Sequence, residues 1–211
     1  MKKIINIFGD ITQDAYFDNT ISASKISNEL KDITAADEIE ININSFGGEV
    51  FEAVAVSNLI AASPASKVFN IVGVCASAAT MLFSANDIVN ISQGAMIMYH
   101  KPSVWSGGNA VDLRKTANLL DKIESENIMK NLVVRTKKPI DELSGLVAAE
   151  WWLTSDEAIS NLGFIATKTI AIENKAAKTK EQNIYKNYIE RKKALAINAH
   201  SIFINHKNSL K

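Results

Sequence analysis

The sequence offers almost nothing that could cross-link the chain or anchor it in a membrane. It has one cysteine among 211 residues, so no internal disulfide can form. No segment approaches the roughly 18 consecutive apolar residues that span a bilayer. The apolar run at residues 4–8 ends at Gly9 and Asp10 and is too short for a secretory signal. We therefore expect a cytoplasmic protein with no targeting sequence and no membrane partner.

Neither sign of charge is in excess, since 23 Lys and Arg residues balance 23 Asp and Glu residues. A balanced charge argues against a nucleic-acid partner, whose phosphates favour a basic face. The phosphate-binding pattern GxxxxGK[ST] is also absent. We expect no nucleic-acid partner, no cofactor and no metal.

Apolar residues make up 47% of the chain, enough for the core of one compact domain. Strand-like runs alternate with helix-like runs, which predicts βαβ units and an α/β fold with a largely parallel sheet. Further along, a run without Gly or Pro predicts a long helix, and two short helices follow. The expected strands cover residues 4–8, 38–44, 67–72, 88–91 and 95–99, and the expected helices cover 24–33, 50–62, 77–85, 109–136, 139–146 and 155–162.

The composition shifts at about residue 171. Beyond this point the chain is rich in Lys and Asn and has neither Gly nor Pro. We therefore divide the protein into a catalytic domain at residues 1–170 and a polar, mostly helical extension at residues 171–211. A partly disordered tail is the alternative.

Two expected strand-to-helix turns contain glycine and come close together in sequence. Gly47 and Gly48 end one strand, and Gly73 precedes Ser77 at the start of another predicted helix. In a parallel sheet both turns lie at the carboxyl ends of strands, where binding sites of such folds gather. Free N–H groups of two neighbouring turns can point at one oxygen and form an oxyanion hole. Close packing of small residues is the alternative explanation.

A histidine strengthens the catalytic interpretation. His100 ends an apolar strand and precedes Lys101 and Pro102, so we place it at the rim of the sheet. A lone histidine there is more often structural. Paired with Ser77, a serine 23 positions upstream, it becomes a candidate base for nucleophilic catalysis.

Four segments in fixed order resemble motifs of ClpP, the proteolytic subunit of the Clp protease. The resemblance extends over roughly residues 4–170 and is closest to phage and prophage ClpP-related proteases proposed to act in capsid maturation. It implies a ClpP/crotonase-like spiral of βαβ units with a long handle helix. The segments are 43–48 (INSFGG, compared with INSPGG), 73–78 (GVCASA, GxAASM), 96–102 (MIMYHKP, MIHQP) and 150–158 with 162–164 (EWWLTSDEA and LGF, DRFLSAxEA and YGL).

The resemblance implies a role for each matched position. Ser77 would be the nucleophile of a serine endopeptidase, His100 its general base and Glu150 the acid of the triad. The backbone N–H groups of Gly48 and Ala78 would form the oxyanion hole.

Three positions depart from the family pattern. Phe46 replaces Pro, Cys75 replaces Ala, and Glu150 replaces Asp, which adds one methylene. A glutamate completes the triad on other folds, so activity is compatible with the change. Asp141 and Asp156 are reserve candidates for the acid, although each is more simply explained as a helix-start residue.

The resemblance also implies partners. We expect peptide or protein substrates, such as phage capsid or scaffold proteins, and an association with proheads in a bacterial host. Residues 103–109, with Trp105, would pair with another copy and build a homo-oligomeric ring, a heptamer or a double ring; a surface loop is the alternative. Only three residues precede the first expected strand, so we expect no Clp-type ATPase partner.

Other classes of function stay open at this stage. The chain could be an inactive structural member of the same family, or an acyl-CoA enzyme of the crotonase type, although no CoA-binding segment is visible. Cys75 could replace Ser77 as nucleophile. A membrane peptidase with a Ser–Lys dyad lacks the membrane segment that it requires.

Overall fold

The structure is a computed structural model that describes residues 1–13 and 20–167, which belong to one unit, Met1–Thr169. The extension expected at residues 171–211 lies outside the described residues. A seven-stranded sheet forms the centre of the unit, with strand order β1-β4-β5-β6-β9; β7 pairs with β5 and with β8. These strands are β1 (Lys2–Phe8), β4 (Glu38–Ser45), β5 (Ser66–Ala76), β6 (Ile88–Ile91), β7 (Met96–Tyr99), β8 (Trp151–Thr154) and β9 (Ile165–Ala166).

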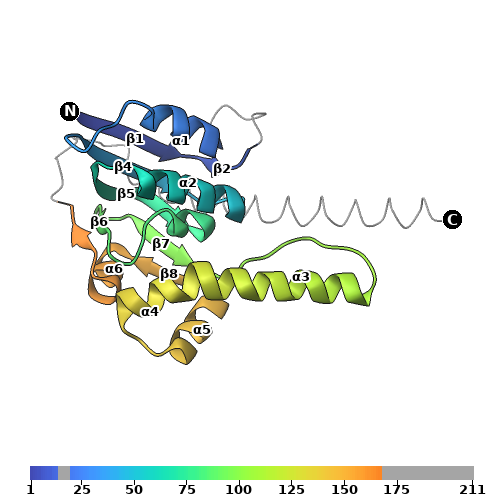
Figure 1. Cartoon of the computed structure of the whole chain (residues 1–211). Coiled ribbons are helices and arrows are strands. Elements are labelled where there is room, and N and C mark those ends of the chain that lie inside the picture. Colours follow the sequence, from blue (N-terminus) through green and yellow to red (C-terminus); the bar gives the residue numbers. More distant parts are fainter. Residues whose placement is uncertain (14–19, 168–211) are drawn as a thin grey trace. The chain divides into compact units, whose positions relative to one another are not determined.

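The isoleucines of β4 show why the sheet forms. Ile39, Ile41 and Ile43 alternate with polar residues and are fully buried on one face of the strand. Helices α1 (Ala23–Leu30) and α2 (Val50–Ala62) cover this face of the sheet (Figure 1). The expected α/β fold with a largely parallel sheet is confirmed, and only β7 and β8 pair in antiparallel fashion.

Strand β5 is longer than expected and carries two sets of neighbours. Its first part pairs with β4 and β6, and its last part, Val74 to Ala76, pairs with β7. The expected end of this strand at Gly73 is therefore wrong. An added Cβ on Gly73 would lie 2.4 Å from the Asn44 side-chain oxygen, so glycine serves here to admit that side chain rather than to end the strand.

The expected helix at residues 77–85 is also wrong, because only a short 3-10 helix, η1 (Ser77–Met81), follows β5. Short apolar runs do not distinguish a buried helix from other buried turns. The long helix is confirmed as one helical run: α3 (Ala110–Ile123), the π-helix η2 (Glu124–Met129) and α4 (Lys130–Thr136). Figure 1 shows α3 extending beyond the sheet to one side.

The last helices are close to those expected, and several short strands are additional. Helix α5 is Ile140–Ala148, and α6 is Ser155–Leu162, where Gly163 ends it in the left-handed conformation. The strands β8 and β9 were not predicted, nor were β2 (Asp10–Ile11) and β3 (Thr20–Ile21), which form a separate pair. No described helix is long and apolar enough to cross a membrane.

A row of asparagine side chains crosses the face of the sheet opposite the buried isoleucines. Asn42 donates to Asn6 at 2.9 Å, Asn70 to Asn42 at 3.0 Å, and Asn90 to Asn70 at 2.8 Å. The residues of each pair lie directly opposite one another on β1, β4, β5 and β6. Asn70 also donates to Glu40 at 2.9 Å, so it is the most connected member of this asparagine ladder.

We predict that Asn70→Ala lowers the free energy of unfolding by about 1–3 kcal/mol, because the Asn42 side-chain oxygen on β4 and the Asn90 side-chain nitrogen on β6 each lose a hydrogen-bond partner. Asn70 is only 9% exposed, so water replaces the lost bonds poorly. The matched control is Asn6→Ala at the exposed end of the ladder, which should cost less than about 0.5 kcal/mol. Urea denaturation measures both values, and equal losses would contradict the prediction.

Candidate active site

The structure brings Ser77 and His100 into direct contact. The Ser77 Oγ and the His100 Nε2 are 2.6 Å apart, a hydrogen-bonding distance. Ser77 follows the end of β5, and His100 follows the end of the neighbouring strand β7. Both residues are half-buried, so the pair is held by the protein and remains open to solvent on one side.

Ser77 has a backbone conformation that few non-glycine residues adopt. Its φ is +57°, whereas the preceding Ala76 is extended. This abrupt change takes Ser77 out of the strand and starts η1 directly. The Thr80 hydroxyl donates to the Ser77 carbonyl at 2.7 Å and thereby fixes the turn. Strain of this kind is typical of sites where the fold presents a nucleophile on a sharp strand-to-helix turn.

The turn after β4 packs against the backbone of that same segment. A Cβ added to Gly47 would lie 2.7 Å from the Ala76 carbonyl oxygen and 2.8 Å from the Ala78 nitrogen. Gly47 also has a φ of +95°, which disfavours any other residue. Only glycine therefore allows the two turns to touch, as the sequence led us to expect of neighbouring strand ends.

Gly48 is oriented by strand β2. The Ile11 N–H donates to the Gly47 carbonyl at 2.9 Å, and the Glu49 N–H donates to the Ile11 carbonyl at 2.8 Å. Together these bonds form a parallel bridge between Ile11 and Gly48. In such a bridge the N–H of the central residue points away from its partner strand. The Gly48 N–H therefore faces away from β2, and the exposed Gly48 is accessible to a substrate.

The contact of β2 with Gly48 could not be predicted from the sequence, because a two-residue strand is too short to have a periodicity of its own. Ala78, the other expected donor, is buried in the first turn of η1. N–H groups in the first turn of a helix have no partner within that helix. The close approach of Gly47 to the Ala78 nitrogen thus sets the Gly47–Gly48 turn against the start of η1, where Ser77 lies.

Glu150 directly precedes β8, as His100 directly follows β7. Strands β7 and β8 are antiparallel, and the last residues that pair at this end are Tyr99 and Trp151. Glu150 is half-buried and has a φ of +58°, which again is rare outside glycine. The expected acid therefore lies between α5 and β8, at the same end of the β7–β8 pair as the candidate base.

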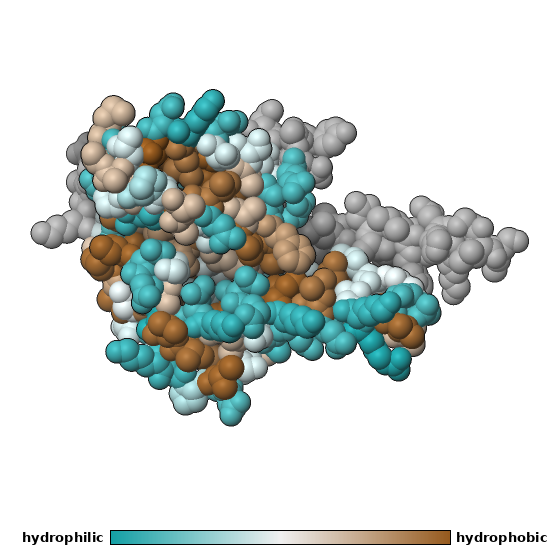
Figure 2. All heavy atoms as spheres, in the orientation of Figure 1, coloured by the Kyte–Doolittle hydropathy of each residue, from teal (hydrophilic) through white to brown (hydrophobic). Residues whose placement is uncertain are grey.

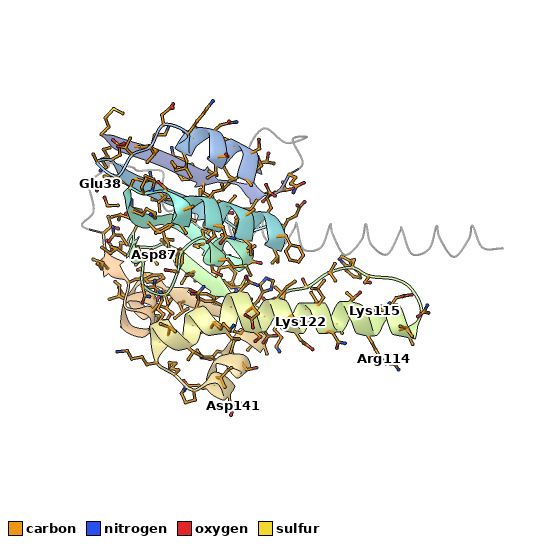
Figure 3. The ribbon with its side chains drawn as sticks, in the orientation of Figure 1. Glu38, Asp87, Arg114, Lys115, Lys122 and Asp141 are labelled. Carbon is orange, nitrogen blue, oxygen red and sulfur yellow. The ribbon has the colours of Figure 1, made fainter. Side chains whose placement is uncertain are left out.

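The reserve acids are placed differently. Asp141 and Asp156 are exposed in the first turns of α5 and α6, where a carboxylate stabilises the positive end of the helix. Figure 3 shows Asp141 at the outer side of α5, away from the sheet. Their helix-start role accounts for both residues and leaves Glu150 as the candidate acid.

Cys75 is not placed to act as a nucleophile. It is fully buried in β5 opposite Ile97 of β7, and burial raises the pKa of its thiol far above the usual range. A thiol that stays protonated is inert.

An ion pair fixes the chain just after His100. The Lys101 ammonium lies 3.1 Å from the mostly buried Glu124 carboxylate at the start of η2. Among the described residues, no cluster of His, Cys, Asp or Glu could hold a metal ion.

We predict that Gly47→Ala reduces the catalytic rate at least about 100-fold, since its Cβ would push the two turns apart and remove a donor from the oxyanion site. The matched control is Gly145→Ala in helix α5, where an added Cβ meets nothing within 4 Å and the activity should be unchanged. Peptide hydrolysis, measured beside thermal unfolding, separates loss of geometry from loss of fold. An active Gly47→Ala enzyme would show that the close contact is dispensable.

Comparisons with known proteins identify relatives of this chain. The model of the Clp protease family matches residues 2–171. "ATP-dependent Clp protease proteolytic subunit 3" of Rhodococcus jostii (strain RHA1) is 31% identical over 141 residues, which cover 64% of this chain and 69% of the relative. "ATP-dependent Clp protease proteolytic subunit 2" of Thermobifida fusca (strain YX) is 28% identical over 153 residues, which cover 68% and 72%.

A solved structure supports the fold. A mutant of ClpP1 from Listeria monocytogenes superposes with a TM-score of 0.65 at 19% identity, covering 80% of this chain and 92% of the other. At that identity the likeness establishes the shared architecture only. Because the family model spans most of the chain, and a relative at 31% identity is matched over more than two thirds of its length, the chain belongs to the Clp protease family and is a ClpP-like serine peptidase.

Proposed function

We propose that the protein is a serine endopeptidase in which Ser77, His100 and Glu150 form a catalytic triad. The observation that carries the proposal is the 2.6 Å contact between the Ser77 hydroxyl and the His100 imidazole. Nucleophile and base within hydrogen-bonding reach, with a third group to orient the base, are the arrangement that activates a serine. His100 follows β7 and Glu150 precedes β8 at the same end of this strand pair, which supports the third role.

In this mechanism, the Ser77 Oγ attacks the carbonyl carbon of the scissile peptide bond while its proton passes to the His100 Nε2. The negative charge that develops on the carbonyl oxygen is stabilised by the N–H groups of Gly48 and Ala78. The imidazolium then gives its proton to the leaving amine, and an acyl-enzyme forms. Water, deprotonated by His100, hydrolyses the acyl-enzyme and restores the Ser77 hydroxyl.

The hydrogen-bonded Ser77–His100 pair favours this function over an acyl-CoA reaction, which uses an oxyanion site but does not require a serine paired with a histidine. It also favours an active enzyme over a purely structural role. A structural protein has no need to keep Ser77 in a strained conformation with its hydroxyl on an imidazole.

We predict that Ser77→Ala lowers peptide hydrolysis more than about 1,000-fold, because the nucleophile is lost while the fold is kept. A fluorophosphonate probe should label wild-type Ser77, as mapped by mass spectrometry, and should leave the variant unlabelled. The matched control is Cys75→Ala, which should keep its activity within a few fold. Activity that persists in Ser77→Ala and disappears in Cys75→Ala would transfer the nucleophile to the thiol.

For the acid, we predict that Glu150→Gln lowers kcat about 100-fold or more, since an amide neither orients the imidazole correctly nor stabilises its charged form. Asp156→Asn serves as control, because its carboxylate belongs to the start of α6. Steady-state kinetics on a fluorogenic peptide distinguish the two variants. Wild-type rates in Glu150→Gln would assign the orienting role to another group.

We also propose that the protein assembles into rings through its handle, the segment 103–109 with helix α3. Members of this family form oligomeric rings in general. The handle of the single chain carries exposed apolar side chains that a second copy could cover, although residues 101–109 form no strand by themselves. Figure 2 shows that hydrophilic residues cover much of α3, with apolar groups at its outer end and along the side facing α2. The exposed apolar residues are Val104, Trp105 (74% exposed), Val111, Leu113 and Leu119.

Capsid maturation without an ATPase stays a prediction, since the relatives are named as subunits of an ATP-dependent protease.

Two measurements on the full chain test the proposed ring assembly and the absence of an ATPase partner. Sedimentation at micromolar concentration should show a heptamer or a double ring, and a monomer would contradict the proposed assembly. Flexible capsid or scaffold segments should be cut without nucleotide, whereas ATP-dependent destruction of a folded substrate with a Clp-type unfoldase would overturn the ATPase-independent role.

A further inference from the structure

Glu52 is a carboxylate buried behind the oxyanion turn, and the proposed mechanism gives it no role. It lies in the first turn of α2 and is only 4% exposed. The Ala23 N–H, at the start of α1, donates to Glu52 Oε1 at 2.5 Å. The Gln13 amide, just after β2, donates to Glu52 Oε2 at 3.0 Å. One buried side chain thus joins three segments that are distant in sequence.

These contacts hold the strand that orients the Gly48 N–H. Strand β2 bridges Gly48 through the two backbone bonds of Ile11, and the Thr12 hydroxyl donates to Glu49 at 2.7 Å. Gln13, the next residue, ends on Glu52. The two residues after β2 are therefore attached to the start of α2 by two side-chain hydrogen bonds, one to Glu49 and one to Glu52.

Such an attachment matters because the hydrogen bond within the oxyanion turn, from the Gly47 N–H to the Ser45 hydroxyl at 3.0 Å, does not involve Gly48. Gly47 and Gly48 have no side chains, and glycine populates many backbone conformations. Their φ values of +95° and +149° are accessible to glycine but are not its only choices. The bridge to β2 selects one backbone conformation for Gly48. A strand of only two residues, however, contributes little stability by itself.

We propose that Glu52 is a positioning residue of the peptidase. It fixes the end of β2 against α2 through Gln13, and the start of α1 against α2 through Ala23. In this way it sets the direction of the Gly48 N–H in the oxyanion hole. The proposal rests on the proposed function, since it deepens the role of the same site. Glu52 touches neither Ser77 nor substrate and acts only through β2. It should therefore affect the stabilisation of the transition state more than the binding of the ground state.

The test compares three variants of the full chain. Glu52→Leu keeps most of the volume and removes both acceptors; we expect kcat to fall about tenfold, less than the about 100-fold or greater loss typical of a deleted oxyanion donor, with KM unchanged within twofold. Glu52→Gln should stay close to wild type. Its carbonyl oxygen can still accept from Ala23, and its amide can donate to Gln13 once that side chain is flipped.

The third variant, Ser22→Ala, controls for a merely structural effect. Ser22 caps the same end of α1 by accepting from the Lys25 N–H at 3.2 Å, and it has no part in the link to Gln13. Its loss should lower the melting temperature and leave kcat unchanged. Equal falls of kcat in Ser22→Ala and Glu52→Leu would reduce Glu52 to a stabiliser of α1 and overturn the proposal.

Two further readouts keep this inference separate from the proposed function. The acid limb of the pH–rate profile reports the base and should not move in Glu52→Leu, because His100 is untouched. Hydrogen exchange of the peptides containing residues 9–12 and 47–49 should become about tenfold faster, also in a Ser77→Ala background where no chemistry occurs. Unchanged exchange would overturn the positioning role, whereas faster exchange with no hydrolysis in the wild type would overturn only the peptidase.

Discussion

The close approach of Gly47 to the backbone of Ala76 and Ala78 is the constraint on which the rest of the site depends. Each turn alone is ordinary. Pressed together, they bring the candidate oxyanion donors and the nucleophile to one point, while the register of β5 and β7 brings His100 to the same point. The chemistry thus relies on backbone atoms that no side-chain substitution can replace, and on one position where a single methyl group is too large.

Much of this fold could be predicted because its signals are local. The bounds of α2, α6 and β6 agree with those expected, because these elements are short apolar or amphipathic runs and residues such as Pro64 and Gly163 mark where the helices end. Strand β8 could not be foreseen, since its short apolar run gains meaning only by pairing with β7, which is some 50 residues earlier in the chain. For the same reason the sequence suggested Glu150 through a motif, whereas its place at the same end of the β7–β8 pair as His100 depends on long-range pairing.

Cys75 and Ser77 illustrate what a sequence pattern leaves undecided. In a regular strand, residues two apart point to the same face, so alternation alone would give both side chains one environment. The positive φ of Ser77 breaks that alternation. The thiol stays in the core with a raised pKa, and the hydroxyl turns toward His100. A backbone angle, invisible in the sequence, separates an inert sulfur from a hydroxyl that contacts a histidine.

The asparagine ladder has a consequence for how the sheet assembles. Parallel strands rich in isoleucine can slide past one another by two residues and still bury the same face. In the native register, four amides form one continuous row; a slip of β6 by two residues would set Asn90 beside Val68 or Val72 instead. The asparagine side chains form their hydrogen bonds only in the native register. The ladder therefore disfavours strand registers that hydrophobic burial alone would tolerate. The register of β5 against β7 also determines where Ser77 meets His100. A register shift of β5 would therefore move Ser77 away from His100.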